Sequence, residues 1–129
     1  MTIRIALIGL GQVGETFAEH FLASIQTRNV DAQIVAVATH NTDSPVALGF
    51  EHSHVPVYKE GLQIAEMGDS IDIIFDLTGN AEFRQQLRNK LQEMKNQHTI
   101  IAPETIARLL WAFFGEDKTL PASHARTGY

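Results

Sequence analysis

Three glycines with a distinctive spacing carry the clearest chemical signal in this sequence. Gly9 follows the apolar run 3–8, and Gly11 and Gly14 open an amphipathic segment. In a G-x-G-x-x-G pattern the first glycine permits a tight turn, and the second lets a pyrophosphate approach the backbone. The third lets a helix pack closely on the strand, and the free N–H groups at the helix start favour phosphate. The alternative interpretation is a glycine-rich turn that binds nothing.

Two further polar segments are expected beside the glycine loop. Ligands of open parallel sheets bind at the carboxyl ends of the strands, so residues that directly follow strands are candidates. The candidate dinucleotide-contacting residues are Gly9, Leu10, Gly11, Gln12, Val13 and Gly14, then Thr39, His40 and Asn41, then Thr78, Gly79 and Asn80. The alternatives are that residues 39–41 are ordinary loop residues, that Gly79 serves only a turn, and that Asn80 only caps the next helix.

The residues after the second expected strand bear on the choice between NAD and NADP. An NAD site usually has an acid about 20 residues past the glycines, for the ribose hydroxyls. Counting alone selects Asp31, which we reject because it precedes the strand and so lies at the wrong end of the sheet. Thr39, His40 and Asn41 occupy the relevant place, and Asp43 could reach back. No arginine marks a 2′-phosphate site, so the cofactor is NAD or NADP, with NAD slightly favoured.

Apolar runs that alternate with helical patterns indicate the elements that position these residues. The expected strands span 3–8, 34–39, 55–58, 71–77 and 99–101, and Pro56 suits an edge strand. Residues 40–53 are interpreted as a loop with one helical turn around Val46 and Leu48. Alternating strands and helices predict an α/β fold of the doubly wound, Rossmann type, with about five parallel strands in the order 3-2-1-4-5.

Helical spacing defines the intervening segments. The first helix carries Val13, Phe17, Phe21 and Ile25 on one stripe, a second spans 59–67, and a third buries Phe83, Leu87, Leu91 and Met94. Pro103 suits the first turn of a last helix, which runs through Phe114. We therefore expect one domain over residues 1–114 and a polar, loosely ordered tail over 115–129.

Composition excludes several classes of function. The chain of 129 residues has a net charge of −5 and no basic run, which argues against nucleic acid as a partner. It has no cysteine for disulfides or thiolate metal sites, and no apolar stretch long enough for a membrane span. His52 and His54 are two residues apart but lack an assignable third ligand, so no metal is predicted. With no secretory signal, a soluble cytoplasmic protein is expected.

Asp76 is the one charged residue that interrupts an apolar strand near its carboxyl end. A buried carboxylate needs hydrogen-bond partners or a raised pKa. Asp76 is therefore either a functional acid or, as we favour, a structural aspartate whose hydrogen bonds are satisfied. No Ser-His-Asp or Cys-His pattern is present, and no catalytic residue is assigned.

Residues 8–14 and the following Phe17–Leu22 resemble the opening of the cofactor domain of homoserine dehydrogenases. The run 71–80, with its Asp-Leu-Thr-Gly-Asn end, looks like the fourth strand of that family. Residues 55–58 are similar to the glucose–fructose oxidoreductase and inositol dehydrogenase group. The resemblance covers about residues 3–102 and implies an NAD(P)-binding domain.

The departures from these families concern catalysis. The resemblance implies an Asn-Lys or Glu-Lys-Pro motif after strand five, whereas this chain has Pro103-Glu104-Thr105 and no lysine. The inositol dehydrogenase group often has a histidine where this chain has Phe83. Both families also attach a substrate domain that we do not find in this chain. The first hypothesis is therefore a dinucleotide-binding or sensing module. The alternatives are a small oxidoreductase with a substrate site between subunits, and a Rossmann module for another nucleotide or a protein.

The last helix has two apolar stripes, which bears on assembly. Ile106, Leu109, Leu110 and Phe113 form one stripe, and Ala107, Trp111 and Phe114 form the other. A surface helix normally buries one stripe, so a second one suggests an interface. We expect a homodimer or a tight complex with a partner protein through Trp111 and Phe114. The alternative is that both stripes are buried within the monomer.

Overall fold

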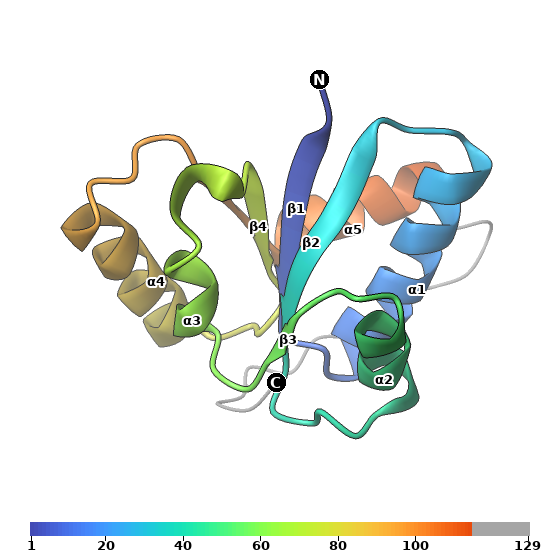
Figure 1. Cartoon of the computed structure of the whole chain (residues 1–129), viewed down its shortest axis with the longest axis horizontal. Helices are drawn as coiled ribbons and strands as arrows, with labels where there is room; N and C mark the ends of the chain where they lie inside the picture. Colours follow the sequence, from blue (N-terminus) through green and yellow to red (C-terminus); the bar gives the residue numbers. More distant parts are fainter. Residues whose placement is uncertain (115–129) are drawn as a thin grey trace.

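The computed structural model describes residues 1–114, and the expected polar tail lies outside the described residues. Five strands form one parallel sheet in the order β3-β2-β1-β4-β5, which confirms the predicted topology. The strands are β1 (Ile3–Ile8), β2 (Ala32–Ala38), β3 (Val57–Tyr58), β4 (Ile73–Asp76) and β5 (Ile100–Pro103). The direction of the sheet order reverses between β1 and β4, so the carboxyl ends of these two strands border the ligand crevice of this fold (Figure 1).

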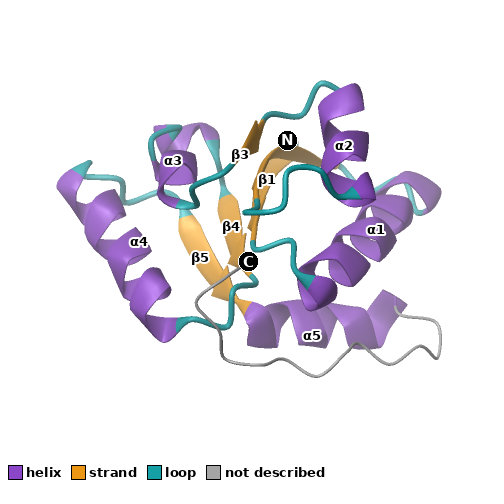
Figure 2. Cartoon of the chain, turned by 90° about the horizontal axis from the view of Figure 1, so that it is seen from below, coloured by secondary structure: helices purple, strands orange, loops and turns teal. Residues whose placement is uncertain are grey.

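Helices cover both faces of the sheet. They are α1 (Gln12–Thr27), α2 (Pro45–His52), α3 (Leu62–Ala65), α4 (Ala81–Glu93) and α5 (Glu104–Phe114), with a 3₁₀ turn at Gly68–Ser70. Figures 1 and 2 show α1, α2 and α5 on one side of the sheet and α3 and α4 on the other. The molecule is a three-layer α/β structure of the Rossmann type.

The alternation of side chains along the strands divides the core into two apolar layers. On β4, Phe75 packs with Phe17 of α1 and Trp111 of α5, while Ile74 packs on the opposite face with Leu87 of α4. The rings of Phe17 and Phe75 have centroids 5.6 Å apart. Both layers extend over β1, so this strand is buried on both faces, as its continuous apolar run predicts.

The segment after β2 differs from the expected loop. Residues 45–52 form a full helix, α2, rather than one helical turn. Ser44 caps it by accepting a hydrogen bond from the Ala47 N–H at 3.1 Å, and Pro45 occupies the first turn, where its missing N–H costs nothing. His52 therefore ends a helix and His54 lies in a turn at φ 65°, so the two do not share a strand face.

Two positions near helix ends also differ from expectation. Met94 is the C-cap of α4 and is 39% exposed, rather than buried with Phe83, Leu87 and Leu91. Pro103 is the last residue of β5 rather than part of the first turn of α5. Among the described residues, β5 is an edge strand with a neighbour on one side only. A proline, which has no N–H to donate to a further strand, is tolerated at such an edge.

The two stripes of α5 differ in burial, except that Leu110 of the first stripe is half-buried and packs against the core. Ala107 and Trp111 are buried against the sheet, and the Trp111 ring meets the His20 ring edge-on at a centroid distance of 4.9 Å. Ile106, Leu109 and Phe113 remain 40%, 55% and 73% exposed. The Trp111 stripe is thus part of the core, which corrects the expected face of association. The Phe114 side chain lies outside the described part.

At the amino edge of the sheet, one carboxylate joins three strands. Asp72, just before β4, accepts hydrogen bonds from the Arg4 backbone N–H at 2.7 Å and from the Arg4 guanidinium at 2.9 and 3.2 Å. His98, just before β5, places Nε2 at 2.5 Å from Asp72 Oδ1. Hydrogen bonds from Arg4, helped by the one with His98, hold the pKa of Asp72 well below its usual value.

Candidate functional site

Gly9 joins the three segments that the sequence placed at the crevice. Its N–H donates to the Ala38 carbonyl at the end of β2, at 2.9 Å. Its φ of +98° belongs to the region that favours glycine, and a Cβ there would lie 2.9 Å from backbone atoms of Leu77 and Thr78. The backbone thus turns sharply off β1 and lies directly against the segment that follows β4.

Gly14 is required by packing. A Cβ on it would lie 1.8 Å from the Gly9 carbonyl oxygen, so a side chain would separate α1 from the end of β1. Gly9 and Gly14 together perform the turning and packing tasks that the motif predicts. Neither requirement involves a ligand, so these two glycines alone would also fit a turn that binds nothing.

Gly11 has no such structural requirement. It has φ −80° and ψ −161°, which any residue adopts, and a Cβ on it would meet nothing within 4 Å. It is the N-cap of α1, and its carbonyl accepts the first helical hydrogen bond from Glu15 at 2.7 Å. The backbone N–H groups that come before Glu15 in the first turn have no acceptor within the helix. The space above Gly11 therefore adjoins several backbone donors.

The other loop residues divide into buried and exposed ones. Leu10 is buried in the core and Val13 is half-buried against it, whereas Gly11 and Gln12 are exposed. Leu10 and Val13 thus attach the loop to the apolar core. Within the loop, Gly11 and Gln12 are the residues with a surface open to a ligand.

The segment after β2 has one buried and two exposed residues. Thr39 is fully buried, its N–H donates to the Tyr58 carbonyl at 2.9 Å, and its Oγ1 accepts from the Asn41 N–H at 3.1 Å. Thr39 therefore shapes the turn, while His40 and Asn41 face solvent. Asp31 lies at the opposite, amino edge of the sheet, where its carboxylate accepts a hydrogen bond from the Thr2 hydroxyl at 2.7 Å. This position agrees with our exclusion of Asp31 as a ribose-binding acid.

The segment after β4 is held by a chain of hydrogen bonds that begins at Asp76. Asp76 Oδ1 accepts from the Thr78 N–H and hydroxyl, and Thr78 Oγ1 accepts in turn from the Asn80 N–H at 3.1 Å. Asn80 Oδ1 caps α4 by accepting from the Phe83 N–H at 3.0 Å. Gly79 lies between them at φ +66°. Thr78 and Asn80 thus have structural roles within the chain. Asp76 holds this segment through Oδ1, but its Oδ2 is buried without a hydrogen bond, so the expected full set of hydrogen bonds is only partly present.

A polar recess connects the second and third segments. It has a volume of about 280 Å³ and includes His40, which follows β2, and Asn80, which follows β4. The sequence interpretation missed the residues that complete it, which are Glu60, Leu62, Glu82, Phe83 and Gln86. The one sequence signal for the close contact between this loop and α4 is Gly61. A Cβ at that position would lie 2.4 Å from the Phe83 ring.

The residue after β5 is an acid engaged in an ion pair. Glu104 opens α5, and its Oε1 lies 3.1 Å from Arg108 Nη2, one turn later. This is the position at which the resemblance implies a lysine. Residues 1–114 contain no group of three or more histidine, cysteine or acidic residues arranged to hold a metal ion. The same residues contain no helix long and apolar enough to cross a membrane.

Solved structures share this fold over most of the chain. Homoserine dehydrogenase from S. aureus, crystallised at pH 6.5, matches 90% of this chain and 30% of its own, with TM-score 0.58 and 20% identity. Homoserine dehydrogenase from Thiobacillus denitrificans matches 91% of this chain and 26% of its own, with TM-score 0.54 and 23% identity. Apo scyllo-inositol dehydrogenase from Lactobacillus casei matches 88% and 34%, with TM-score 0.52 and 19% identity.

These matches define the class of protein by its fold. The chain is a Rossmann-type domain similar to one part of homoserine and inositol dehydrogenases, and it spans about 30% of the first of these proteins. No family model matches the sequence, and no curated protein does. At such identities the likeness establishes the fold, and the site must carry the argument about function.

Proposed function

We propose that this chain binds a nicotinamide dinucleotide across the carboxyl edge of its sheet, with the pyrophosphate above Gly11. The observation that carries the proposal is the open space at Gly11, beside the N–H groups of the first turn of α1. Gly9 and Gly14 are explained by packing. Gly11 is the N-cap of α1, a position that accepts glycine but also several residues with side chains, so the chain itself does not require this position to be open. A bound pyrophosphate would require it to be open. The fold shared with two kinds of dehydrogenase supports the choice of a nicotinamide dinucleotide.

We propose further that NAD is preferred to NADP. No arginine or lysine occurs between residues 39 and 44, and Asp43 lies in this loop. The recess beside His40 adds the carboxylates of Glu60 and Glu82. A 2′-phosphate placed near these carboxylates would be repelled by them, which disfavours NADP.

Titration calorimetry of the purified chain with NAD, NADH, NADP and NADPH tests both proposals. We expect NAD or NADH to bind, and the corresponding phosphorylated form to bind at least about tenfold more weakly, which is ~1.4 kcal/mol. Binding of none of the four would refute dinucleotide binding. Equal or tighter binding of NADP would refute only the preference.

The role we propose is that of a dinucleotide-binding or sensing module rather than a catalyst of hydride transfer on its own. The supporting observation is Glu104, paired with Arg108, where the resemblance implies a lysine. Hydride transfer also needs a substrate held against the nicotinamide. The alternative is an oxidoreductase whose substrate site forms between subunits. NAD(P)-linked turnover of homoserine or myo-inositol by the purified chain would favour that alternative.

The proposed partner for assembly is a second copy of the chain, and the proposed surface is the exposed stripe of α5. Ile106, Leu109 and Phe113 leave three large apolar side chains in solvent. Arg108 and Glu104 pair with each other along the helix. The stripe itself carries no charge, so it can meet its own copy without like-charge repulsion.

A further inference from the structure

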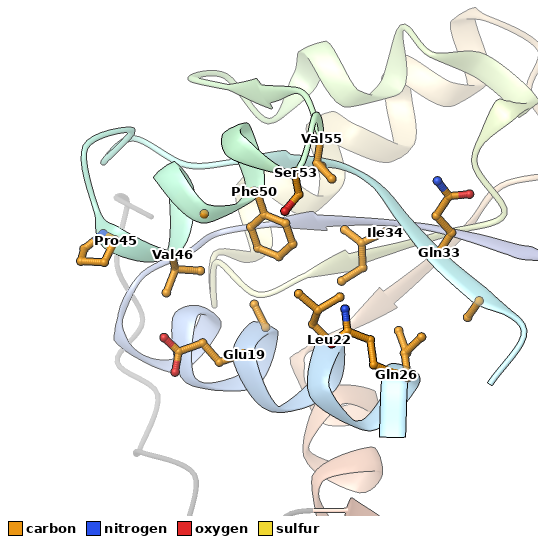
Figure 3. Close-up of a pocket in the computed structure, with 14 residues that line it drawn as sticks. Glu19, Leu22, Gln26, Gln33, Ile34, Pro45, Val46, Phe50, Ser53 and Val55 are labelled. Atoms are coloured by element: carbon orange, nitrogen blue, oxygen red, sulfur yellow. The ribbon is translucent and has the colours of Figure 1, made fainter. Parts of the chain in front are cut away.

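A second hollow lies between α1 and α2, beside the amino-terminal half of β2 (Figure 3). Its volume is about 500 Å³. Leu22 and Ile25 line it from α1, Val46 and Phe50 line it from α2, and Ile34 forms its floor. The hollow lies away from the glycine loop, and the proposed dinucleotide site does not use it.

Its size and lining are those of a small-molecule site. Such sites typically enclose about 300–1,000 Å³, with mostly apolar walls and a few polar groups that orient the ligand. Here the polar side chains are those of Glu19, Gln26 and Ser53. Gln33 borders the hollow from β2, but its side chain points to the opposite side of the strand from Ile34. Figure 3 shows Glu19 and Gln26 on α1 towards opposite ends of the hollow. The side chain of Ile34, at the floor, is buried.

Gly49 is an independent sign that this space is kept open. It lies inside α2 on the face that lines the hollow, one turn after Pro45 and one turn before Ser53. Glycine in a helix interior costs up to about 1 kcal/mol relative to alanine. A Cβ at Gly49 would meet nothing within 4 Å, and its φ is outside the range that favours glycine. The local structure therefore does not require glycine here, and the absence of a side chain leaves more room in the hollow for a ligand.

The charge of the lining indicates the chemistry of the ligand. Glu19 is the one charged residue of the lining. Its side chain makes no ion pair or hydrogen bond within the described part of the chain. A ligand with a positively charged end would pair with Glu19, whereas a carboxylate at that end would be repelled. The apolar walls require the rest of the ligand to be hydrophobic.

We propose that the hollow between α1 and α2 binds a small hydrophobic amine, with the apolar body against Ile34 and Phe50 and the ammonium group near Glu19. The inference is independent of dinucleotide binding, because it uses a different surface.

Three naphthyl compounds of similar shape test the proposal on the whole chain. They are 1-naphthylmethylamine, 1-naphthylmethanol and 1-naphthoate, which carry a positive, a neutral and a negative end. Methyl NMR of the wild-type chain should show shifts at Ile34, Val46 and Val55 on titration with the amine. We expect the amine to bind about two- to fivefold more tightly than the alcohol, and the carboxylate to bind most weakly.

Variants at Gly49 and Glu19 separate the site from general hydrophobic adsorption. Gly49→Leu should fill the hollow and remove binding of all three probes, with a melting temperature equal to or above that of the wild type. Gly49→Ala should fold and weaken binding by a smaller factor. Glu19→Gln should bring the amine to the affinity of the alcohol. Leu48→Ala, on the outer face of the same helix, should leave binding unchanged.

Three results would overturn the proposal. The first is absence of methyl shifts at the hollow with the amine, and the second is undiminished binding in Gly49→Leu. The third is a carboxylate that binds as well as the amine, which would refute the proposed charge preference.

Discussion

One oxygen of the Asp76 carboxylate accepts both hydrogen bonds that Thr78 donates, from the N–H at 3.1 Å and from the hydroxyl at 2.6 Å. The other oxygen is buried without a hydrogen bond, and Arg84 Nη1 lies 3.9 Å from it. This carboxylate is fully buried, so its few partners must compensate for the lost solvation. The segment after β4 thus owes its shape to a carboxyl group inside the molecule.

Removal of the Thr78 hydroxyl should destabilise the fold. Thr78→Val keeps the shape of the side chain but leaves Asp76 with the backbone N–H as its remaining hydrogen-bond donor. We expect the free energy of unfolding to fall by about 1–3 kcal/mol in urea denaturation. Thr78→Ser retains the hydroxyl and should lose less. Equal stability of Thr78→Val and the wild type would show that the hydroxyl does not stabilise the buried carboxylate.

Substitutions at Gly11 and Gly14 should separate binding from folding. Gly11→Val places a side chain in open space, so it should abolish NAD(H) binding while the circular dichroism spectrum stays nearly unchanged. Its cost to stability should not exceed that of a poor N-cap, about 1 kcal/mol. Gly14→Ala forces a Cβ to within 1.8 Å of the Gly9 carbonyl and should lower the melting temperature sharply. Undiminished NAD(H) affinity in Gly11→Val would refute the proposed site.

Much of the fold was predictable because the strongest signals are local. The apolar run 3–8 gives β1 with its observed bounds, and the glycines locate the crossover to α1. The helix α2 was missed although Ser44 and Pro45 are a regular helix start, because Gly49 and the surrounding polar residues suggest a loop. The two stripes of α5 were recognised from periodicity alone. Which stripe faces the sheet depends on contacts such as Trp111 with His20, and these come from α1, far away in the sequence.

The candidate site was less predictable for a related reason. The glycine loop is a contiguous motif, so its residues could be named in advance. The recess beside His40 is built from loops and helices that follow three different strands, and Glu60, Glu82 and Gln86 match no local pattern. Only the sheet order brings them together.

Trp111 should behave as a core residue and not as an interface residue. It is 7% exposed, and it packs against α1. Trp111→Ala should reduce the free energy of unfolding by about 3–5 kcal/mol, the usual cost of truncating a buried aromatic ring. Phe113→Ala, two residues later but 73% exposed, should change the stability of the monomer by less than about 0.5 kcal/mol. Similar losses in both variants would contradict the observed orientation of α5.

The stability of the chain should fall in acid partly because of Asp72. Its pKa is lowered in the folded state by hydrogen bonds from Arg4, so the ionised form stabilises the fold. This contribution is complete above the unfolded-state pKa of about 3.9, and it is lost as the pH falls towards the lower folded-state value. Melting temperatures of the wild type and Asp72→Asn should therefore differ most near neutrality and converge below about pH 4. Asp43→Asn, in an exposed loop, is the control, and parallel curves for wild type and Asp72→Asn would exclude this role.

The proposed self-association through the exposed stripe of α5 should be sensitive to charge at Leu109 and Phe113. These side chains are 55% and 73% exposed, and a carboxylate at each would have to be buried, unpaired, in a dimer interface. Light scattering should find a dimer for the wild type at high micromolar concentration and a monomer for Leu109→Glu with Phe113→Glu. Met94→Glu, which changes an exposed apolar residue after α4, should remain dimeric. A wild-type monomer at that concentration would refute the homodimer, and a dimer that survives the double substitution would place the interface elsewhere.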